Sequence, residues 1–316
     1  MEATVSVIIP VFNAEQYIEK AIISAIQQPE VKQIIVVNDG STDNTEHILD
    51  KLLIDYSILE VYYHTNKENR GRSATRNLAL QKAKCNYIAF LDADDFYLEH
   101  RFLKDFEIIN HNKFLDGVYN AIGVHFYREY KDSEFEKLKL TTITKKISPE
   151  NLFENLIYHK NGHFSLDGLL LKSDVFNKIG LFNEELAVGE DSDLILKAAI
   201  VCKLESGQID KPVAIRGVHE KNIFNNSQFY SDYNFKVFES LLFWCYKKNV
   251  DLKYVDWIMD NLWRLKFKEK LSMLTYIRYW STLFIINPKV LFSKLAIKYF
   301  PLIRLRKQYF SFLYNK

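Results

Sequence analysis

Three aspartates crowd the end of one apolar stretch. Asp92, Asp94 and Asp95 close the segment YIAFLDADD, residues 87–95. Like charges this close repel each other and persist at the end of a buried strand only beside a cationic partner. Their hard oxygen ligands favour Mn²⁺ or Mg²⁺, with coordination positions left open for a phosphate. A solvated strand-to-loop turn is the alternative, because Asp is common in turns.

A second pair of acids is suited to proton transfer. Glu190 and Asp191 stand directly before an apolar helical pattern. The dipole at a helix N-terminus stabilises Asp191 as a carboxylate, which is the form that a general base needs. The same residue types also occur as ordinary punctuation at helix N-termini. Both interpretations stay open from this stretch alone.

The elements that must position these acids alternate along the first hundred residues. Apolar, β-branched runs predict buried strands, and apolar residues at helical spacing predict helices between them. The pattern predicts a mostly parallel α/β sheet flanked by helices, whose ligands sit beyond the carboxyl ends of its strands. The predicted strands are 5–11, 31–37, 59–63 and 87–91, and the predicted helices are 14–28, one from 45, and 73–84.

The carboxyl ends of these strands carry few glycines. Neither G-x-G-x-x-G after the first strand nor G-x-x-x-x-G-K-[ST] occurs, which disfavours dinucleotide and P-loop binding. Asp39, after the second strand, is able to accept hydrogen bonds from a base or ribose edge, or to form a plain turn. An acidic, glycine-poor rim suits a nucleotide whose phosphates are neutralised by a metal.

Composition describes a globular enzyme with an unusual tail. The 316 residues are 48% hydrophobic, and the three cysteines, Cys85, Cys202 and Cys245, have no metal or redox spacing. With neither a signal-peptide pattern nor an uncharged apolar run of about 18 residues, we expect a cytoplasmic protein. Residues 261–316 hold twelve Lys or Arg against one acid, Glu269, although the whole chain has a net charge of +2.

Four blocks in order give a specific resemblance. The stretches VSVIIPVFNAEQYIEKAIISAIQQ, IIVVNDGSTDNT, NRGRSATRN and AFLDADD resemble successive motifs of the family 2 glycosyltransferases. In the third block, Thr75 stands where the family usually has Ala. Together with DGLLLK…GED further on, the resemblance covers roughly residues 4–220. It implies a GT-A fold and transfer of a sugar from a nucleotide donor, with inversion, assisted by a divalent cation, Mn²⁺ or Mg²⁺.

The resemblance also implies roles at matching positions. Asp191 matches the general base, with Glu190 beside it. Asp94 matches the metal ligand, and His219 falls where many members have a His that reaches the metal or diphosphate. Asp95 is left either as a further site acid or as a cap of the next helix. The positions that match the nucleotide-sugar site are Pro10, Phe12, Asn13, Glu15, Asp39, Asn69, Arg76 and Asp92.

The resemblance implies a UDP-sugar donor and a saccharide or lipid-linked acceptor, and His163 is a weaker candidate for contact with an acceptor sugar. We expect a GT-A domain over residues 1–225, with a nucleotide half to 100 and an acceptor half from 101. Residues 226–316 are expected to form a helical, basic and aromatic extension. Cations interleaved with aromatic rings favour contact with a membrane surface at its inner face, or else packing on a second subunit. Because the rest of the chain is acidic, no nucleic-acid partner is expected.

Two other functions remain to be distinguished. A glycoside hydrolase also uses paired carboxylates but needs no nucleotide site. A nonenzymatic sugar-nucleotide binder or membrane scaffold would bind UDP without turnover.

Overall fold

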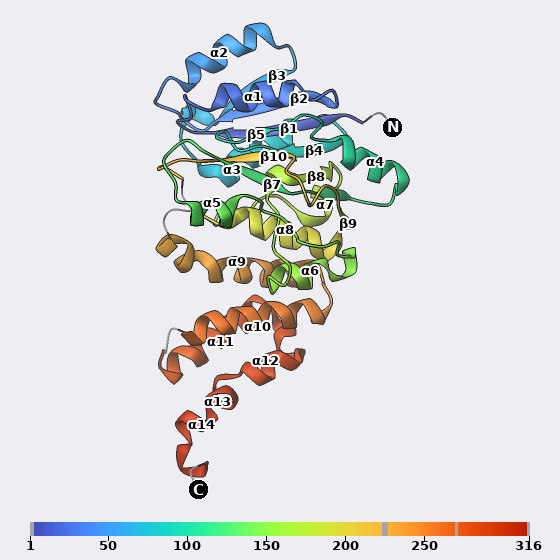
Figure 1. Ribbon diagram of the computed structural model, residues 1–316. Coiled ribbons are helices and arrows are strands. Elements are labelled where there is room, and N and C mark those ends of the chain that lie inside the picture. The colour runs from blue at the N-terminus through green and yellow to red at the C-terminus, as the bar shows by residue number, and fades with distance from the viewer. Residues whose placement is uncertain (1–2, 223–226, 269–270, 315–316) are drawn as a thin grey trace. The chain divides into compact units, whose positions relative to one another are not determined.

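The computed structural model describes residues 3–222, 227–268 and 271–314 (Figure 1). The chain divides into two compact units, Met1–Ser227 and Gln228–Lys316. The first unit holds two sheets, and the second is helical in the part that the structure describes.

The larger sheet has seven strands in the order β3-β2-β1-β4-β8-β6-β9. The first four run parallel to one another, β8 is antiparallel to both β4 and β6, and β9 is parallel to β6. Its strands are β1 (Val5–Val11), β2 (Val31–Asn38), β3 (Leu59–Tyr63), β4 (Tyr87–Phe90), β6 (Gly117–Tyr119), β8 (Leu169–Lys172) and β9 (Leu204–Ser206).

A smaller sheet is built from short strands that follow β4, β6 and β9 in the sequence. Its order is β5-β10-β7, with β5 (Phe96–Tyr97) antiparallel and β7 (Ile122–Phe126) parallel to β10 (Ala214–Val218). β6 and β7 are separated by only two residues but belong to different sheets, because Asn120 and Ala121 between them bond to Gly168 and Gln208.

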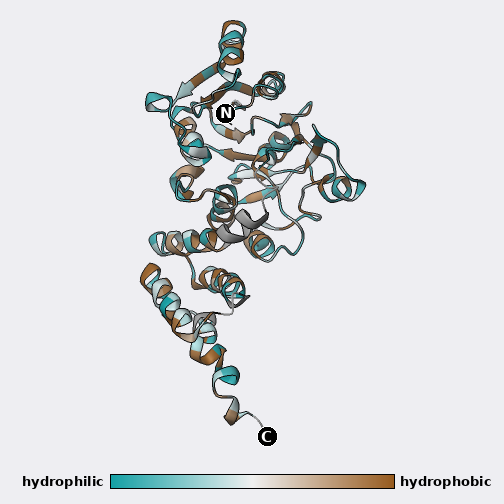
Figure 2. Ribbon diagram, turned by 90° about the vertical axis from the view of Figure 1, so that its left-hand side faces the viewer, coloured by the Kyte–Doolittle hydropathy of each residue, from teal (hydrophilic) through white to brown (hydrophobic). Residues whose placement is uncertain are grey.

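Helices cover both faces of the larger sheet. The side chains of Val5, Val7 and Ile9 pack with α1 and α4 in one apolar core, whereas α3 packs on β1 and β2. Figure 2 shows hydrophobic residues on the strands and a mixture of hydrophobic and hydrophilic residues along the helices. The helices of this unit are α1 (Ile18–Ile26), α2 (Thr45–Asp55), α3 (Gly71–Lys82), α4 (Leu103–His111), α5 (Asp132–Leu138), α6 (Pro149–Ile157), α7 (Val175–Ile179) and α8 (Glu190–Val201), with 3₁₀ turns η1 (Thr65–Lys67) and η2 (Leu166–Gly168).

The first helix begins later than the expected residue 14. Ala14 starts a turn, and its N–H donates to Thr45 Oγ1 at 3.0 Å. The regular helix begins at Ile18. The chain is thus tied to the start of α2 before α1 begins.

The second unit has its own apolar core. Buried residues from three helices form it, among them Leu241, Ile258, Trp263 and Leu283. Residues 288–299 form a 3₁₀ turn and a helix divided at Ser293, and Glu269 and Lys270 lie outside the described residues. The elements are α9 (Ser227–Lys247), α10 (Leu252–Lys268), α11 (Met273–Ile286), η4 (Pro288–Phe292), α12 (Lys294–Tyr299), α13 (Pro301–Arg304), α14 (Arg306–Tyr309) and η5 (Ser311–Leu313).

Candidate functional site

Three carboxylates meet at the end of β4. Asp92 and Asp95 follow that strand, and Asp167 lies in η2, just before β8. Because β8 runs antiparallel to β4, with Leu170 opposite Ala89, the start of one strand lies beside the end of the other. One carboxylate oxygen from each of the three acids lies within 4.8 Å of the other two.

Backbone donors hold these acids in place. Asp167 Oδ1 accepts the N–H of Asp92 at 3.1 Å, and Asp95 Oδ1 accepts the N–H of Gly217 at 2.8 Å. Of the two alternatives for Asp95, the helix cap is excluded, because α4 begins only at Leu103 and its N-cap is Phe102. Burial and the neighbouring acids raise the pKa of Asp95 well above its ordinary value, and burial and Asp92 raise the pKa of Asp167.

This donor set fits a hard divalent cation. Carboxylate oxygens are the ligands that Mg²⁺ and Mn²⁺ prefer. The pKa values of Asp95 and Asp167 are raised by burial first and by neighbouring negative charges second, and a bound cation would offset those charges. Asp92, Asp95 and Asp167 could therefore hold a metal ion.

Asp94 has different partners from the acids on either side of it. Its Oδ2 lies 3.0 Å from Nε2 of His219 and accepts from Nδ2 of Asn222 at 2.9 Å. The imidazole stacks on the ring of Tyr17, with 4.9 Å between centroids and 11° between planes. The two residues expected to bind the metal are thus brought together, from segments 125 positions apart.

Arg76 connects the donor-side acids to the acceptor-side acids. The guanidinium donates from Nη2 to Asp92 Oδ1 at 2.6 Å and from Nη1 to Glu190 Oε1 at 2.8 Å. Its side chain is 2% exposed, as is that of Glu190. Arg72 adds a longer contact, with its Nε 3.3 Å from Glu190 Oε1.

The charges in this bridge determine the protonation of its acids. Burial by itself raises the pKa of Asp92, but the positive charges of Arg76, Arg72 and Arg216 together outweigh burial and lower it. The pKa of Glu190 is raised, by burial first and by Asp191 second, and Arg76 and Arg72 only partly offset this. Burial alone would lower the pKa of Arg76, but Asp92 and Glu190 raise it, so the guanidinium stays charged.

Asp191 lies in the first turn of α8. The turn is made possible by Gly189, whose φ of 78° is a left-handed conformation that favours glycine. Asp191 is half-buried, and its Oδ1 accepts the N–H of Ser192 at 2.7 Å. The segment leading to this turn is fixed by Asn77 of α3, whose amide donates to the carbonyl of Phe182 and accepts that residue's N–H.

Asp39 organises the loop that leads into α3. Its two oxygens accept the N–H groups of Arg70 at 2.7 Å and Gly71 at 2.9 Å, and its side chain is buried. Asn69, expected to line the nucleotide site, is exposed on this loop. Asp39 therefore holds the loop that leads into α3.

The first block contributes one free aromatic face. Phe12 is 50% exposed just beyond β1, whereas Pro10 is buried within that strand. Asn13 Oδ1 accepts the N–H of Thr42 at 2.7 Å, and Glu15 Oε2 accepts the N–H of Asn44 at 2.9 Å. Asn13 and Glu15 thus hold the loop after β2 against the loop after β1.

Four residues around the acids were not expected from sequence. They are Tyr17, Asp167, Arg216 and Asn222, none of which stood out by spacing. Arg216 lies on β10 next to Gly217, and its positive charge contributes to the lowered pKa of Asp92 and partly offsets the raised pKa values of Asp95 and Asp167. The sequence signal that could have identified Arg216 is a charged residue within an apolar strand.

His163 is exposed, and its contact with an acceptor sugar stays a prediction.

Comparison with known proteins agrees with this architecture. Residues 6–180 match the family model described as glycosyl transferase family 2. An uncharacterized glycosyltransferase of Haemophilus influenzae is 33% identical over 144 residues, which make up 45% of this chain and 54% of that protein. The minor teichoic acid biosynthesis protein GgaB of Bacillus subtilis is 32% identical over 194 residues, 60% of this chain and 20% of that protein. This chain therefore spans about half of the first relative and a fifth of the second.

The fold also has a counterpart among solved structures. S. aureus TarS 1–349, in complex with UDP-GlcNAc, superimposes with a TM-score of 0.66 at 18% sequence identity, covering 96% of this chain and 92% of that one. The likeness includes the C-terminal helical region. The expected mostly parallel sheet flanked by helices is confirmed, as is the resemblance drawn from the sequence motifs.

Proposed function

The chain belongs to glycosyl transferase family 2, and on that premise we propose that it is a metal-dependent, inverting hexosyltransferase acting in cell-surface polysaccharide synthesis. The donor is a UDP-hexose or UDP-N-acetylhexosamine, and the acceptor is a hydroxyl of a glycan or lipid-linked saccharide. The name of GgaB, a minor teichoic acid biosynthesis protein, supports a place in cell-surface polysaccharide synthesis, and the UDP-GlcNAc complex of TarS supports a UDP-sugar donor.

One observation carries the proposal: Arg76 bonds to Asp92 and Glu190 at once. Asp92 adjoins the acids suited to a donor's metal, and Glu190 adjoins Asp191. A single buried cation therefore holds the two acidic segments at a fixed separation. Transfer needs this arrangement, because acceptor oxygen and anomeric carbon must be aligned before they react.

Asp191 acts as the general base. It accepts the proton of the acceptor hydroxyl while that oxygen forms a bond to the anomeric carbon. The bond from this carbon to the diphosphate oxygen breaks at the same time, on the opposite face of the sugar, and UDP leaves with both electrons of that bond. A single displacement of this kind gives a β linkage from an α-linked donor. The bond from Arg76 keeps Glu190 occupied, which leaves Asp191 as the free carboxylate of the two.

Asp94 and His219 are the proposed metal ligands, with Asp92 on the nucleotide side, and Asp95 and Asp167 offer further carboxylate oxygens that could complete the metal's coordination. When bound, Mn²⁺ or Mg²⁺ would neutralise charge on the diphosphate, an effect worth several kcal/mol in a site that excludes water. Arg76 and Arg216 add fixed positive charge near the same oxygens. His219 is oriented for this role by its stacking on Tyr17.

The nucleoside end of the donor is assigned to the loops after β1 and β2. Phe12 offers an exposed ring for the base, with Pro10 forming the floor. Asp39 and Asn69 are retained as the ribose and base contacts, next to the Asn13 and Glu15 bonds that shape this rim. Because both Asp39 oxygens already accept backbone N–H groups, its contact with a donor would use their remaining lone pairs.

The helical unit is proposed to contact the inner face of the membrane. Of the helices that the structure describes, none has the length and apolarity to cross a bilayer. Large apolar side chains are nonetheless exposed among its cations, for example Ile285, Phe292 and Phe312, at 77%, 75% and 73%. Such a surface suits anionic headgroups and the apolar boundary beneath them.

The proposed chemistry is tested by comparing two neighbouring substitutions. With Mn²⁺ and a panel of UDP-sugars and saccharide acceptors, Asp191→Asn should lower transfer by about 10²- to 10⁴-fold. Because the Asp191 carboxylate is not proposed to contact the UDP-sugar, the thermal stabilisation of the protein by UDP should be unchanged. Ser192→Ala, at the exposed adjacent position, should retain full activity. Full activity in Asp191→Asn would refute the base, a retained α linkage would refute inversion, and UDP binding without any turnover would point to a nonenzymatic binder.

A further inference from the structure

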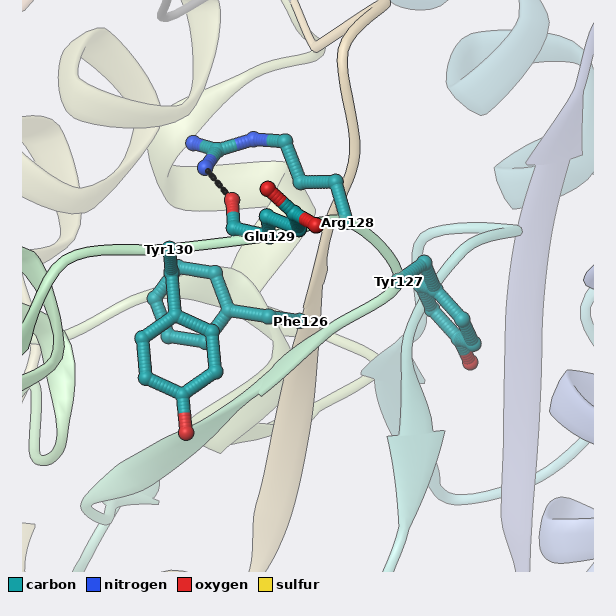
Figure 3. A pocket seen from close by; sticks show the side chains of 5 residues that line it. All are labelled: Phe126, Tyr127, Arg128, Glu129 and Tyr130. Atoms are coloured by element: carbon teal, nitrogen blue, oxygen red, sulfur yellow. Dashed lines mark hydrogen bonds between the residues drawn. The ribbon is translucent and has the colours of Figure 1, made fainter.

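An open pocket lies where β7 ends. It has a volume of about 650 Å³ and is lined by five consecutive residues, 126–130 (Figure 3). A strand alternates its side chains between two faces, so the chain leaving β7 can serve two surfaces at once. Figure 3 shows Phe126 and Tyr130 overlapping on one side and Tyr127 turned to the other.

The pocket is built on stacked aromatic rings. Phe126 and Tyr130 have centroids 4.2 Å apart and planes 24° from parallel, and Phe135 of α5 lies 6.0 Å beyond Tyr130. Tyr130 is 51% exposed and Phe135 is 38% exposed. The stack therefore keeps open ring surface, which favours a ligand with a flat apolar face and polar edges.

The polar groups of the pocket are nearly balanced in charge. Arg128 donates from Nη1 to Glu134 Oε2 at 3.0 Å and to the carbonyl of Glu129 at 2.8 Å. Residues 126–138 hold three basic and four acidic side chains. A phosphate or carboxylate ligand would meet a guanidinium that is already paired and a surplus of negative charge. Uncharged hydroxyl groups are able to bond to the carboxylate and guanidinium edges without such a penalty.

The other side of the same segment touches the candidate site. The ring of Tyr127 lies 4.7 Å from that of Tyr17, which in turn stacks on His219. β7 and β10 run parallel, with Phe126 opposite Val218, and the N–H of Tyr127 donates to the carbonyl of Val218 at 2.9 Å. A Cβ atom on Gly217 would come within 2.7 Å of the Tyr127 ring and 2.1 Å of the Asp94 carbonyl. The pocket is thus built directly against the segment that carries Asp94 and His219.

We propose that this pocket is an acceptor subsite, which binds an uncharged pyranose unit of the acceptor through the stack of Phe126 and Tyr130. A pyranose ring presents C–H groups on its face and hydroxyls on its edge, which matches open rings bordered by Arg128 and Glu134. Tyr127 couples the subsite to the metal-side residues, so an occupied pocket places the rest of the acceptor near them. This inference rests on the proposed glycosyl transfer and adds the charge class of the acceptor and the residues that recognise it.

The subsite is tested by saturation-transfer NMR on the full-length protein. The probes are neutral methyl β-glycosides of glucose, galactose and N-acetylglucosamine, with glycerol 3-phosphate and methyl glucuronide as anionic comparisons. At least one neutral glycoside should receive saturation on its ring C–H protons, and the anionic probes should not. Tyr130→Ala and Phe135→Ala should weaken that glycoside's binding by about fivefold to tenfold, the scale of one aromatic stacking contact.

Two control variants make the result specific. Tyr130→Phe keeps the ring and should retain binding, and Phe114→Ala removes an aromatic residue that is 82% exposed elsewhere in the same unit. Thermal stabilisation by UDP with Mn²⁺ is recorded on every variant. When UDP stabilises the protein, three outcomes would refute the subsite. They are neutral-glycoside binding that Tyr130→Ala leaves unchanged, no binding of any neutral glycoside, and binding of the anionic probes instead. If no UDP-sugar stabilises the wild type, the proposed function itself fails.

Discussion

Arg76 and Glu190 form a buried ion pair between residues 114 positions apart in the chain. Nη1 of the arginine donates to Oε1 of the glutamate at 2.8 Å, and both side chains are 2% exposed. The pair joins the middle of α3 to the start of α8. It therefore fixes the distance between the acids after β4 and the turn that carries Asp191.

Removing the cation from this pair should be costly. Arg76→Met leaves Glu190 buried without its main partner, so the free energy of unfolding should fall by about 3–5 kcal/mol. Arg72→Met is the matched control, because Arg72 reaches the same carboxylate from a half-exposed position and should change stability by less than about 1 kcal/mol. Urea denaturation of both variants makes the comparison. Equal losses would show that Arg76 does not have the central role assigned to it.

The stability of the metal-free protein should depend on pH in a defined direction. The pKa values of Asp95 and Asp167 are raised above the ordinary 3.8. A raised carboxyl pKa contributes stability that is complete below the unfolded pKa and is lost as pH rises through the folded one. The metal-free protein should therefore lose this contribution above about pH 4, over the window between the unfolded and folded pKa values.

A cation should restore what deprotonation removes. Because Mn²⁺ and protons compete for the same carboxylates, Mn²⁺ should raise the melting temperature more at pH 7.5 than at pH 5.5. At 100 times its dissociation constant, the ion should add about 2.7 kcal/mol. Chelation by EDTA should reverse the gain. Asp167→Asn should reduce it, whereas Asp50→Asn, on the exposed face of α2, should not, and equal gains at both pH values would contradict the assignment.

The helical unit should bind anionic membranes. Vesicles that contain one third phosphatidylglycerol should co-sediment with the protein, and 0.5 M salt should weaken the binding, because salt screens the basic side chains. Phe292→Ser and Phe312→Ser should each reduce it by removing apolar surface. Phe114→Ser, an equally exposed aromatic of the other unit, is the control. Equal binding to neutral vesicles, or none to either kind, would contradict membrane contact.

The sequence by itself determined the elements that local patterns encode. β1 and β3 have the predicted bounds, and α2 begins at the predicted Thr45, because β-branched runs and helical spacing of apolar residues act within a few positions. It also predicted that Asp94 and His219 share a site, and that Asp191 begins a helix. Motif order and helix punctuation carried that information without reference to any contact.

Tertiary structure alone decided which acids stand together. Asp167 joins Asp92 and Asp95 only because β8 pairs antiparallel with β4. The local sequence of neither strand predicts this register. The bridge from Arg76 to Glu190 and the split of residues 117–126 into strands of two different sheets have the same origin. Pairing between distant strands and burial of distant charges depend on the whole core, whereas periodicity and capping report only on neighbours along the chain.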